Sequence, residues 1–422
     1  MKDQQKDIED IQSSKHTRMR SLGSTEHLFW LLDQNRPTHF AMVAEVDRSF
    51  PPQAWHAAFR SVQRRHPLLS TFIGVDAQGN TGFHGATDAT VPLRVIEREP
   101  DTWRREVARE IATPFDWSVA PLWRATLLQG AHASTLILVV HHSVLDGMGS
   151  AYLIQDLLLA LSGEALAPLG LVESLETLLE SQMNSAAVLP AAAPALSPRS
   201  FRPGAEDVPQ IDALAFPAEF TRRLIARARA EQTTVHGAIA AAVHEAGRRL
   251  SREWRSRPLR TVTPVDVRHL ASEVGTSSGV YITQTITVDD HPPGAPLWIA
   301  ARKIKRDLVP AQTPTQAAAE LKALDAAMSV KPSVQHAASF LSTVLAFDVL
   351  LSNLGNQPVA SAYGDITLEA LWGPFVTSGF ADDQVIGVCT TGGVLRLTHT
   401  SYAAIPGLLS EIRTIIEAAV NA

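Results

Sequence analysis

The chain has 422 residues, 45% of them hydrophobic and 19% charged, which is the balance of a globular protein with enough material for two domains. Its formal net charge of -6 argues against nucleic acid and against an anionic membrane surface as general partners. The single cysteine, Cys389, excludes an intrachain disulfide framework, so we expect it to serve in packing and the protein to be cytoplasmic.

The N-terminus carries no targeting signal that we can recognise. Residues 1–20 lack the apolar core of a signal peptide, and no apolar run in the chain approaches the ~18 residues that a membrane span requires. We therefore expect a flexible tail over residues 1–20 and no membrane span. Docking of a partner by this tail is the alternative interpretation.

The first half alternates strand and helix signals. Met42–Asp47 and Ala125–Gly130 read as strands, and Thr135–Val140 is a β-branched and leucine run typical of a strand buried on both faces. Residues 151–163 predict a helix, with leucine and isoleucine at helical spacing and Gly163 as its stop.

Two histidines, His141 and His142, end the buried strand. Successive side chains of a strand point to opposite faces, so the two rings cannot both enter one cavity. We expect one histidine to be structural and the other to be a general base braced by a nearby carboxylate. The following Asp146-Gly147 pair predicts a turn.

A composition shift marks a boundary between halves. Residues 185–209 are rich in alanine, proline, serine and glycine, which is typical of a linker, so we expect an N-terminal subdomain over 21–184 and a C-terminal one over 210–422. In the second half we expect a helix over Phe216–Ala230, a closing helix over Ile405–Ala419 and four strands. These strands are Val280–Val288, Leu345–Asn353, Gln384–Gly393 and Val394–Tyr402.

The spacing His141-His142-x-x-x-Asp146-Gly147 resembles the HHxxxDG motif of the acyltransferases with a chloramphenicol-acetyltransferase-like fold. That superfamily includes nonribosomal peptide condensation domains, polyketide-associated acyltransferases, and wax-ester and alcohol acyltransferases. Further segments resemble the family in the same order, so the resemblance covers nearly the whole chain. They are Arg20–Leu32, Arg64–Phe72, Pro114–Leu128, Thr234–Ala246, Thr263–Arg268 and Leu350–Gly355.

The resemblance implies an α/β fold of two chloramphenicol-acetyltransferase-like sandwich domains that form a V around a central substrate tunnel. It also implies a phosphopantetheine thioester donor, on coenzyme A or on an acyl or peptidyl carrier protein, and a small alcohol or amine as acceptor. No bound cofactor and no metal are implied.

The resemblance also assigns residues. His142 is the expected base, Asp146 and Gly147 complete the catalytic motif, and His141 is structural. Asp146 is expected to pair with Arg268, although a plain turn is the alternative, and the Gly147 amide could help to stabilise the oxyanion. Substrate contacts are expected from Met148, Asn353 and Gly355, with a strand-ending turn as the alternative for the last two.

Rival motifs fit less well. Gly275–Gly279 matches a G-x-S-x-G elbow around Ser277, but a polar segment precedes the serine and a strand follows it, whereas an elbow lies between a strand and a helix. Zinc binding by His141, His142 and Asp146 is disfavoured because adjacent strand histidines diverge. His236 and His244 are expected to pack or to face solvent.

We therefore predict a stand-alone, monomeric acyltransferase that forms an ester in polyketide, nonribosomal peptide or lipid secondary metabolism. The alternatives are an amide-forming free-standing condensation domain, a non-catalytic module that recruits a carrier protein, and an epimerase. The basic run Arg248–Arg257 could dock an acidic carrier; a solvated helix face is its other interpretation.

Overall fold

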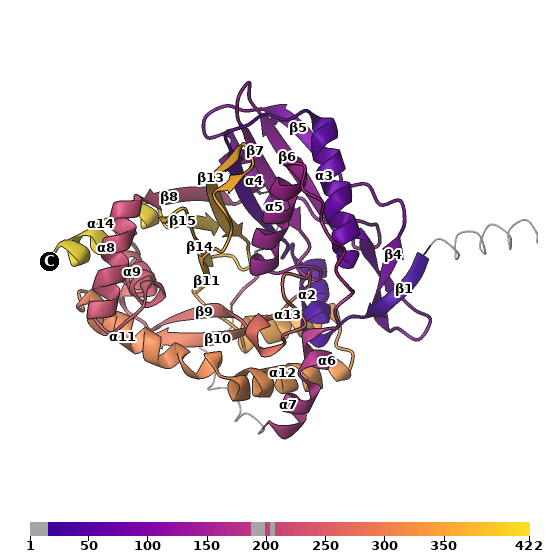
Figure 1. The fold of residues 1–422 in the computed structure, drawn as a ribbon. Helices are drawn as coiled ribbons and strands as arrows, with labels where there is room; N and C mark the ends of the chain where they lie inside the picture. Colours follow the sequence, from indigo (N-terminus) through magenta and orange to yellow (C-terminus); the bar gives the residue numbers. More distant parts are fainter. Residues whose placement is uncertain (1–15, 187–198, 203–206) are drawn as a thin grey trace, which may run out of the picture.

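The structure is a computed structural model that describes residues 16–186, 199–202 and 207–422. It has two α/β halves, each built on a six-stranded sheet, and a small three-stranded sheet at one end (Figure 1). Within the described ranges, no helix combines the length and the apolar character needed to cross a membrane.

The sheet of the first half is centred on the strand that carries the two histidines. This strand, β7, is buried along its whole length and pairs antiparallel with β2 on one side and β6 on the other, as its unbroken apolar run predicts. The sheet order is β12-β13-β2-β7-β6-β5. The bounds are β2 Phe40–Val46, β5 Leu93–Glu97, β6 Trp123–Gln129, β7 Ser134–Val140, β12 Ala362–Tyr363 and β13 Ile366–Phe375.

Helices cover both faces of this sheet. Alternate residues of β7 join different cores: Leu136 and Leu138 pack with α3 (Pro52–Arg65) and α5 (Gly147–Leu161), whereas Ile137 packs with α4 (Thr102–Ala112). This is the period-2 alternation of a strand. It sends the residues that follow β7 to opposite sides as well.

The small sheet corrects the expected tail. Its order is β1-β4-β3, with β1 His16–Ser21, β3 Thr71–Val75 and β4 Thr81–Ala86. Residues 16–20 therefore belong to a strand rather than to a flexible tail, because the backbone of β1 is paired with β4. Residues 1–15 lie outside the described part of the chain.

The sheet of the second half has the order β10-β9-β11-β14-β15-β8. The expected helix from Phe216 begins two residues later, at Ala218, because Gln210–Phe216 pairs with β15 as strand β8. β14 and β15 form a hairpin, and both turn glycines, Gly392 and Gly393, have positive φ. The strand bounds are β8 Gln210–Phe216, β9 Leu259–Asp266, β10 Ile282–Asp289, β11 Val349–Asn356, β14 Gln384–Thr391 and β15 Val394–Ser401.

One core joins this sheet to four of its helices, α8, α9, α11 and α14. Their bounds, in that order, are Ala218–Ala230, Val235–Leu250, Leu297–Leu308 and Leu408–Asn421. The remaining helices are α2 Ser24–Asn35, α6 Leu175–Leu178, α7 Glu180–Ser185, α10 Arg252–Arg255, α12 Pro314–Ser329 and α13 Val334–Thr343.

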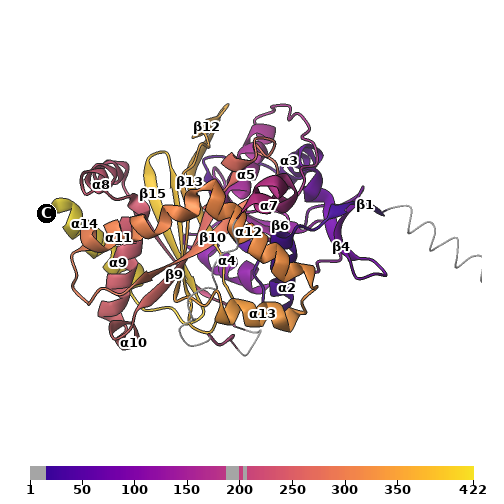
Figure 2. The ribbon, with the colours of Figure 1, turned by 90° about the horizontal axis from the view of Figure 1, so that it is seen from below.

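The two halves are interlocked rather than divided at residues 185–209. Strand β13 belongs to the second half of the sequence but pairs with β2 in the first sheet, and α12 and α13 contact α2 (Figure 2). Most of the expected linker lies outside the described residues. Its described piece is anchored, since the Arg202 amide donates to the Gly379 carbonyl at 3.0 Å.

Candidate active site

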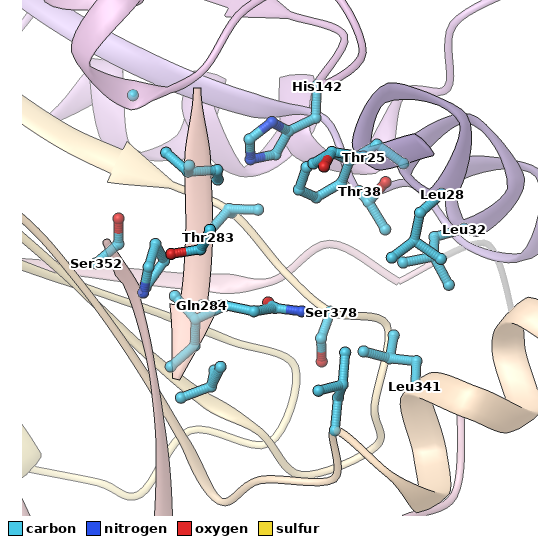
Figure 3. Close-up of a pocket in the computed structure, with 18 of the residues that line it drawn as sticks. Thr25, Leu28, Leu32, Thr38, His142, Thr283, Gln284, Leu341, Ser352 and Ser378 are labelled. Atoms are coloured by element: carbon cyan, nitrogen blue, oxygen red, sulfur yellow. The ribbon is translucent and has the colours of Figure 1, made fainter. Parts of the chain in front are cut away.

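A cavity of about 610 Å³ lies where the two halves meet. The first half contributes α2, the start of β2, His142 and the first turn of α5; the second contributes β9, β10, β11, α12 and α13. The buried strand β7 delivers His142 to this cavity, as Figure 3 shows.

His142 lies between aromatic rings. Its imidazole stacks on Phe29, with ring centroids 3.9 Å apart and planes 4° apart, and lies 4.9 Å from the ring of Phe40. Burial among these groups lowers the pKa of His142 to about 4, because desolvation penalises the charged imidazolium. The ring is therefore neutral at pH 7. The His142 side chain lines the cavity.

His141 points the other way, as the strand geometry predicts. It is fully buried, its Nδ1 accepts from the Ser143 amide at 3.2 Å, and its Nε2 lies 3.5 Å from Oδ2 of Asp33. Although burial raises the pKa of Asp33, contacts with His141 and His39 lower it below its ordinary value. The sequence alone did not indicate Asp33.

Asp146 is the centre of a buried polar cluster. Arg268 donates from Nη1 to its Oδ2 at 2.6 Å, so the expected ion pair is present. The same carboxylate also accepts from the amides of Gly149 at 2.8 Å and Tyr281 at 2.9 Å. Asp146 is thus both the N-cap of α5 and a link to the second half, so the turn and ion-pair interpretations hold together.

Gly147 is required here for a close approach. A Cβ atom at this position would lie 2.7 Å from Cδ2 of Leu354 in the other half. Gly147, Met148, Asn353 and Leu354 all line the cavity. The loop after His142 and the end of β11 therefore meet at the cavity wall.

Gly355 does not line the cavity among the described residues, so its expected contact with substrate stays a prediction. Its φ is +69°, and its amide donates to Oδ1 of Asn353 at 2.8 Å. The residue is needed for a turn with left-handed backbone, which glycine adopts without a steric penalty.

Two carboxyl groups that line the cavity were not predicted from the sequence. Burial raises the pKa of Glu320, on α12, to about 7 and also raises that of Asp266, at the end of β9. Oε1 of Glu320 accepts from Gln316 at 3.0 Å, while its buried Oε2 has no partner among the described residues. Nothing in the alanine-rich sequence of α12 indicates a functional carboxyl group.

The rival motifs lead elsewhere. Ser277 lies in a loop between Arg268–Leu270 and β10 rather than on a strand-to-helix elbow. Among the described residues, the grouping with metal-ligand spacing is Asp289, Asp290 and His291, but Asp289 is already paired with Arg248.

The two other histidines and the cysteine named in the sequence analysis serve in packing. His244 contacts Thr261 at 2.6 Å, and burial lowers the pKa of His236 to about 4. Burial also raises the pKa of the Cys389 thiol to about 12, which fits the expected packing role.

The site thus combines His142, which lines a cavity where two α/β halves meet, with the buried Asp146–Arg268 pair on the loop that follows it. Two family models match the chain. Residues 29–167 match the family described as "Condensation domain", and residues 205–293 match "Phthiocerol/phthiodiolone dimycocerosyl transferase C-terminus". Each match covers less than half of the chain; together they show a similarity to condensation domains and polyketide-associated acyltransferases, and they support an acyltransferase.

Individual relatives are distant. The chain is 30% identical over 115 residues to tyrocidine synthase 3 of Brevibacillus parabrevis, which is 27% of this chain but only 2% of that protein. Polyketide synthase associated protein 5 from Mycobacterium tuberculosis has 18% identity and a TM-score of 0.66, with 96% of this chain and 99% of that chain covered. TRI3 trichothecene 15-O-acetyltransferase from Fusarium sporotrichioides has 13% identity and a TM-score of 0.68, with 96% of each chain covered. These solved structures show the fold.

Proposed function

We propose that this protein transfers an acyl group from a phosphopantetheine thioester to a hydroxyl acceptor, with His142 as general base. One observation carries the proposal: His142 lines a cavity to which both halves contribute, and burial lowers the pKa of its imidazole to about 4. A neutral imidazole can take a proton from an alcohol at pH 7.

In the proposed reaction, Nε2 of His142 removes the hydroxyl proton as the acceptor oxygen attacks the thioester carbonyl carbon. The C–S bond then breaks, the ester forms, and the imidazolium returns its proton to the leaving thiolate. The Asp146–Arg268 pair positions the loop between His142 and α5. We assign the Gly147 amide, at the first turn of α5, as a donor to the oxyanion.

Two of the similarities favour ester formation over amide formation. One matched family is a dimycocerosyl transferase, and one fold relative is a 15-O-acetyltransferase. Amide formation is the second candidate, because residues 29–167 match the condensation domain and the curated relatives include peptide synthetases. The non-catalytic alternative leaves the cavity-facing base unexplained, and release of a carbon-bound proton would identify an epimerase.

The donor is proposed to be carried by coenzyme A or by an acyl or peptidyl carrier protein in the cytoplasm. The basic run Arg248–Arg257 contributes little support for a carrier, because several of its charges are used within the chain. Arg249 pairs with Glu245 and Glu411, and Arg257 pairs with Glu253 and Asp348.

The test is acyl transfer by the purified protein from acyl-pantetheine thioesters to a panel of alcohols and amines, followed by intact-mass detection of product. His142→Ala should lower kcat by about 10²- to 10⁴-fold. His132→Ala, which changes an exposed histidine between β6 and β7, should leave the rate unchanged. If His142→Ala forms ester at an undiminished rate, the assignment of His142 as the base is wrong. If the unmodified protein forms only amide product, the assignment of a hydroxyl acceptor is wrong.

A further inference from the structure

The wall of the cavity is chemically divided. Where α2 approaches α12 and α13, it is made mainly of leucine and phenylalanine side chains, among them Leu28, Leu32 and Leu341, and Glu320 is the carboxyl group that α12 adds there. The start of β10 presents Thr283 and Gln284, and the middle of β11 presents Ser352 and Asn353. Figure 3 shows Leu28, Leu32 and Leu341 on one side of the site, and Thr283 and Ser352 on the other.

A second cavity, of about 450 Å³, continues from the apolar side. It shares the lining residues Leu28, Leu324 and Phe340 with the first, so the two cavities adjoin at these three side chains. The rest of its wall is mostly apolar and reaches the surface at Val330, which is 77% exposed. Its further apolar lining residues are Ala327, Met328, Pro332 and Ala337.

The two charged or titratable groups of the second wall do not make it polar. The Lys331 amine donates to Oδ1 of Asn80 at 2.9 Å and to the Gln78 carbonyl at 3.1 Å, and Nδ1 of His336 lies 3.1 Å from the Ser333 hydroxyl. Each of these groups is therefore engaged next to the cavity. A ligand in this passage gains burial of apolar surface rather than specific hydrogen bonds.

We infer that this passage between α2, α12 and α13 holds an unbranched aliphatic acyl chain of the donor, and that the polar wall of β10 and β11 receives the hydroxyl acceptor. This inference rests on the proposed function and specifies its substrate class as medium- to long-chain acyl thioesters. A hydroxyl compound on the apolar side would lose hydrogen bonds to water without replacement, which costs free energy. The hydroxyl and amide side chains of the opposite wall supply such replacements.

The acyl chain length should control the rate. Each further methylene that enters an apolar wall from water should raise kcat/KM by about fourfold until the passage is filled. We therefore expect kcat/KM to rise steeply from hexanoyl- to decanoyl- to tetradecanoyl-pantetheine. A rate that is equal for the three donors, or that falls along the series, would overturn the inference.

One substitution should block the second cavity without changing a residue that lines the first. Ala327, an exposed residue of α12, lines only the second cavity. Ala327→Phe should lower the tetradecanoyl-to-hexanoyl ratio of kcat/KM by at least about tenfold, because the ring occupies the space of several methylenes. Ala326→Phe is the matched control: Ala326 is exposed on the same helix and outside both cavities among the described residues, so the ratio should stay the same. An unchanged ratio in Ala327→Phe contradicts the inference.

A binding experiment separates this inference from the proposed reaction. Decanoyl-pantetheine with a diazirine at the end of its chain is photolysed on the full protein, and cross-linked peptides are mapped by mass spectrometry. We expect cross-links in α12 and α13 that excess unlabelled thioester suppresses. Such cross-links without ester product would retain the inference and reject the reaction. Ester product with cross-links in β10 and β11, or with none above background, would retain the reaction and reject the inference.

Discussion

At the residue scale, the contrast between His141 and His142 follows from one property of β-strands. Neighbouring side chains lie on opposite faces, so His141 enters the buried first half beside Asp33 while His142 enters the cavity beside Phe29. The sequence predicts this divergence without any structure. It does not predict the partners, because Asp33 and Phe29 come from a distant helix region.

The environment of His142 predicts the pH dependence of acyl transfer. Burial lowers its pKa to about 4, and a base acts only when deprotonated. The kcat/KM should therefore be constant from about pH 6 to 8 and fall only as the pH approaches 4. Phe29→Ala admits water to the ring and should move this acid limb upward, toward the ordinary histidine pKa of about 6.5. An acid limb near 6.5 in the unmodified protein would show that His142 is not desolvated, and circular dichroism at each pH would exclude unfolding.

The Asp146–Arg268 pair is a further residue-scale feature, and the family resemblance predicted it. Asp146 is fully buried, so Arg268→Ala leaves an uncompensated carboxylate in the protein interior. We expect a loss of about 3 to 5 kcal/mol in the free energy of unfolding, measured by urea denaturation. The double variant Asp146→Asn with Arg268→Ala should lose less than the sum of the single variants. Additive losses would mean that the two side chains act independently.

At the element scale, the start of α5 packs against the end of β11. In Gly147→Ala, the new methyl group would lie 2.7 Å from Leu354, whose flexible side chain must move. Because Leu354 lines the cavity, we expect kcat/KM to fall by roughly tenfold. Helix propensity alone would favour alanine by about 1 kcal/mol, so activity rather than stability is the informative measurement. In a Leu354→Ala background, Gly147→Ala should lower kcat/KM much less than it does in the unmodified protein. An equal loss of kcat/KM in both backgrounds would contradict the steric explanation.

The same elements show where prediction from sequence succeeds. β7, β14 and β15 were predicted because their apolar runs and the glycine turn are local signals. β8 was not predicted, and its last residue, Phe216, was placed in the following helix, since a short strand before an amphipathic helix has no distinct period of its own. The placement of α12 beside α2, which brings Glu320 into the cavity wall, depends on contacts between residues about 300 positions apart. No local pattern encodes such contacts.

At the scale of the whole molecule, sequence composition suggested two separable subdomains, whereas the structure shows interlocked halves. β13 completes the first sheet beside β2, and its Trp372 stacks on Trp103 of α4 at 5.7 Å while donating from Nε1 to Glu45 at 2.7 Å. The first half without β13 would expose the edge of β2, whose backbone groups would then lack partners. The first sheet is therefore not complete within its own half of the sequence, whereas the six strands of the second sheet all come from the second half.

This interlocking predicts cooperative unfolding, which two ordinary domains of this size would not show. Differential scanning calorimetry of the full chain should give a single transition, because loss of either half removes contacts of the other. Trp372→Ala should lower that single transition temperature by a few degrees without splitting it. A matched substitution in the second core, Trp298→Ala in α11, should do the same, although Trp298 contacts only its own half's core cluster. Two resolved transitions, each sensitive to only one of these tryptophans, would mean that β13 does not couple the halves. A single transition that both substitutions lower would mean that the cavity between the halves is assembled only when both are folded.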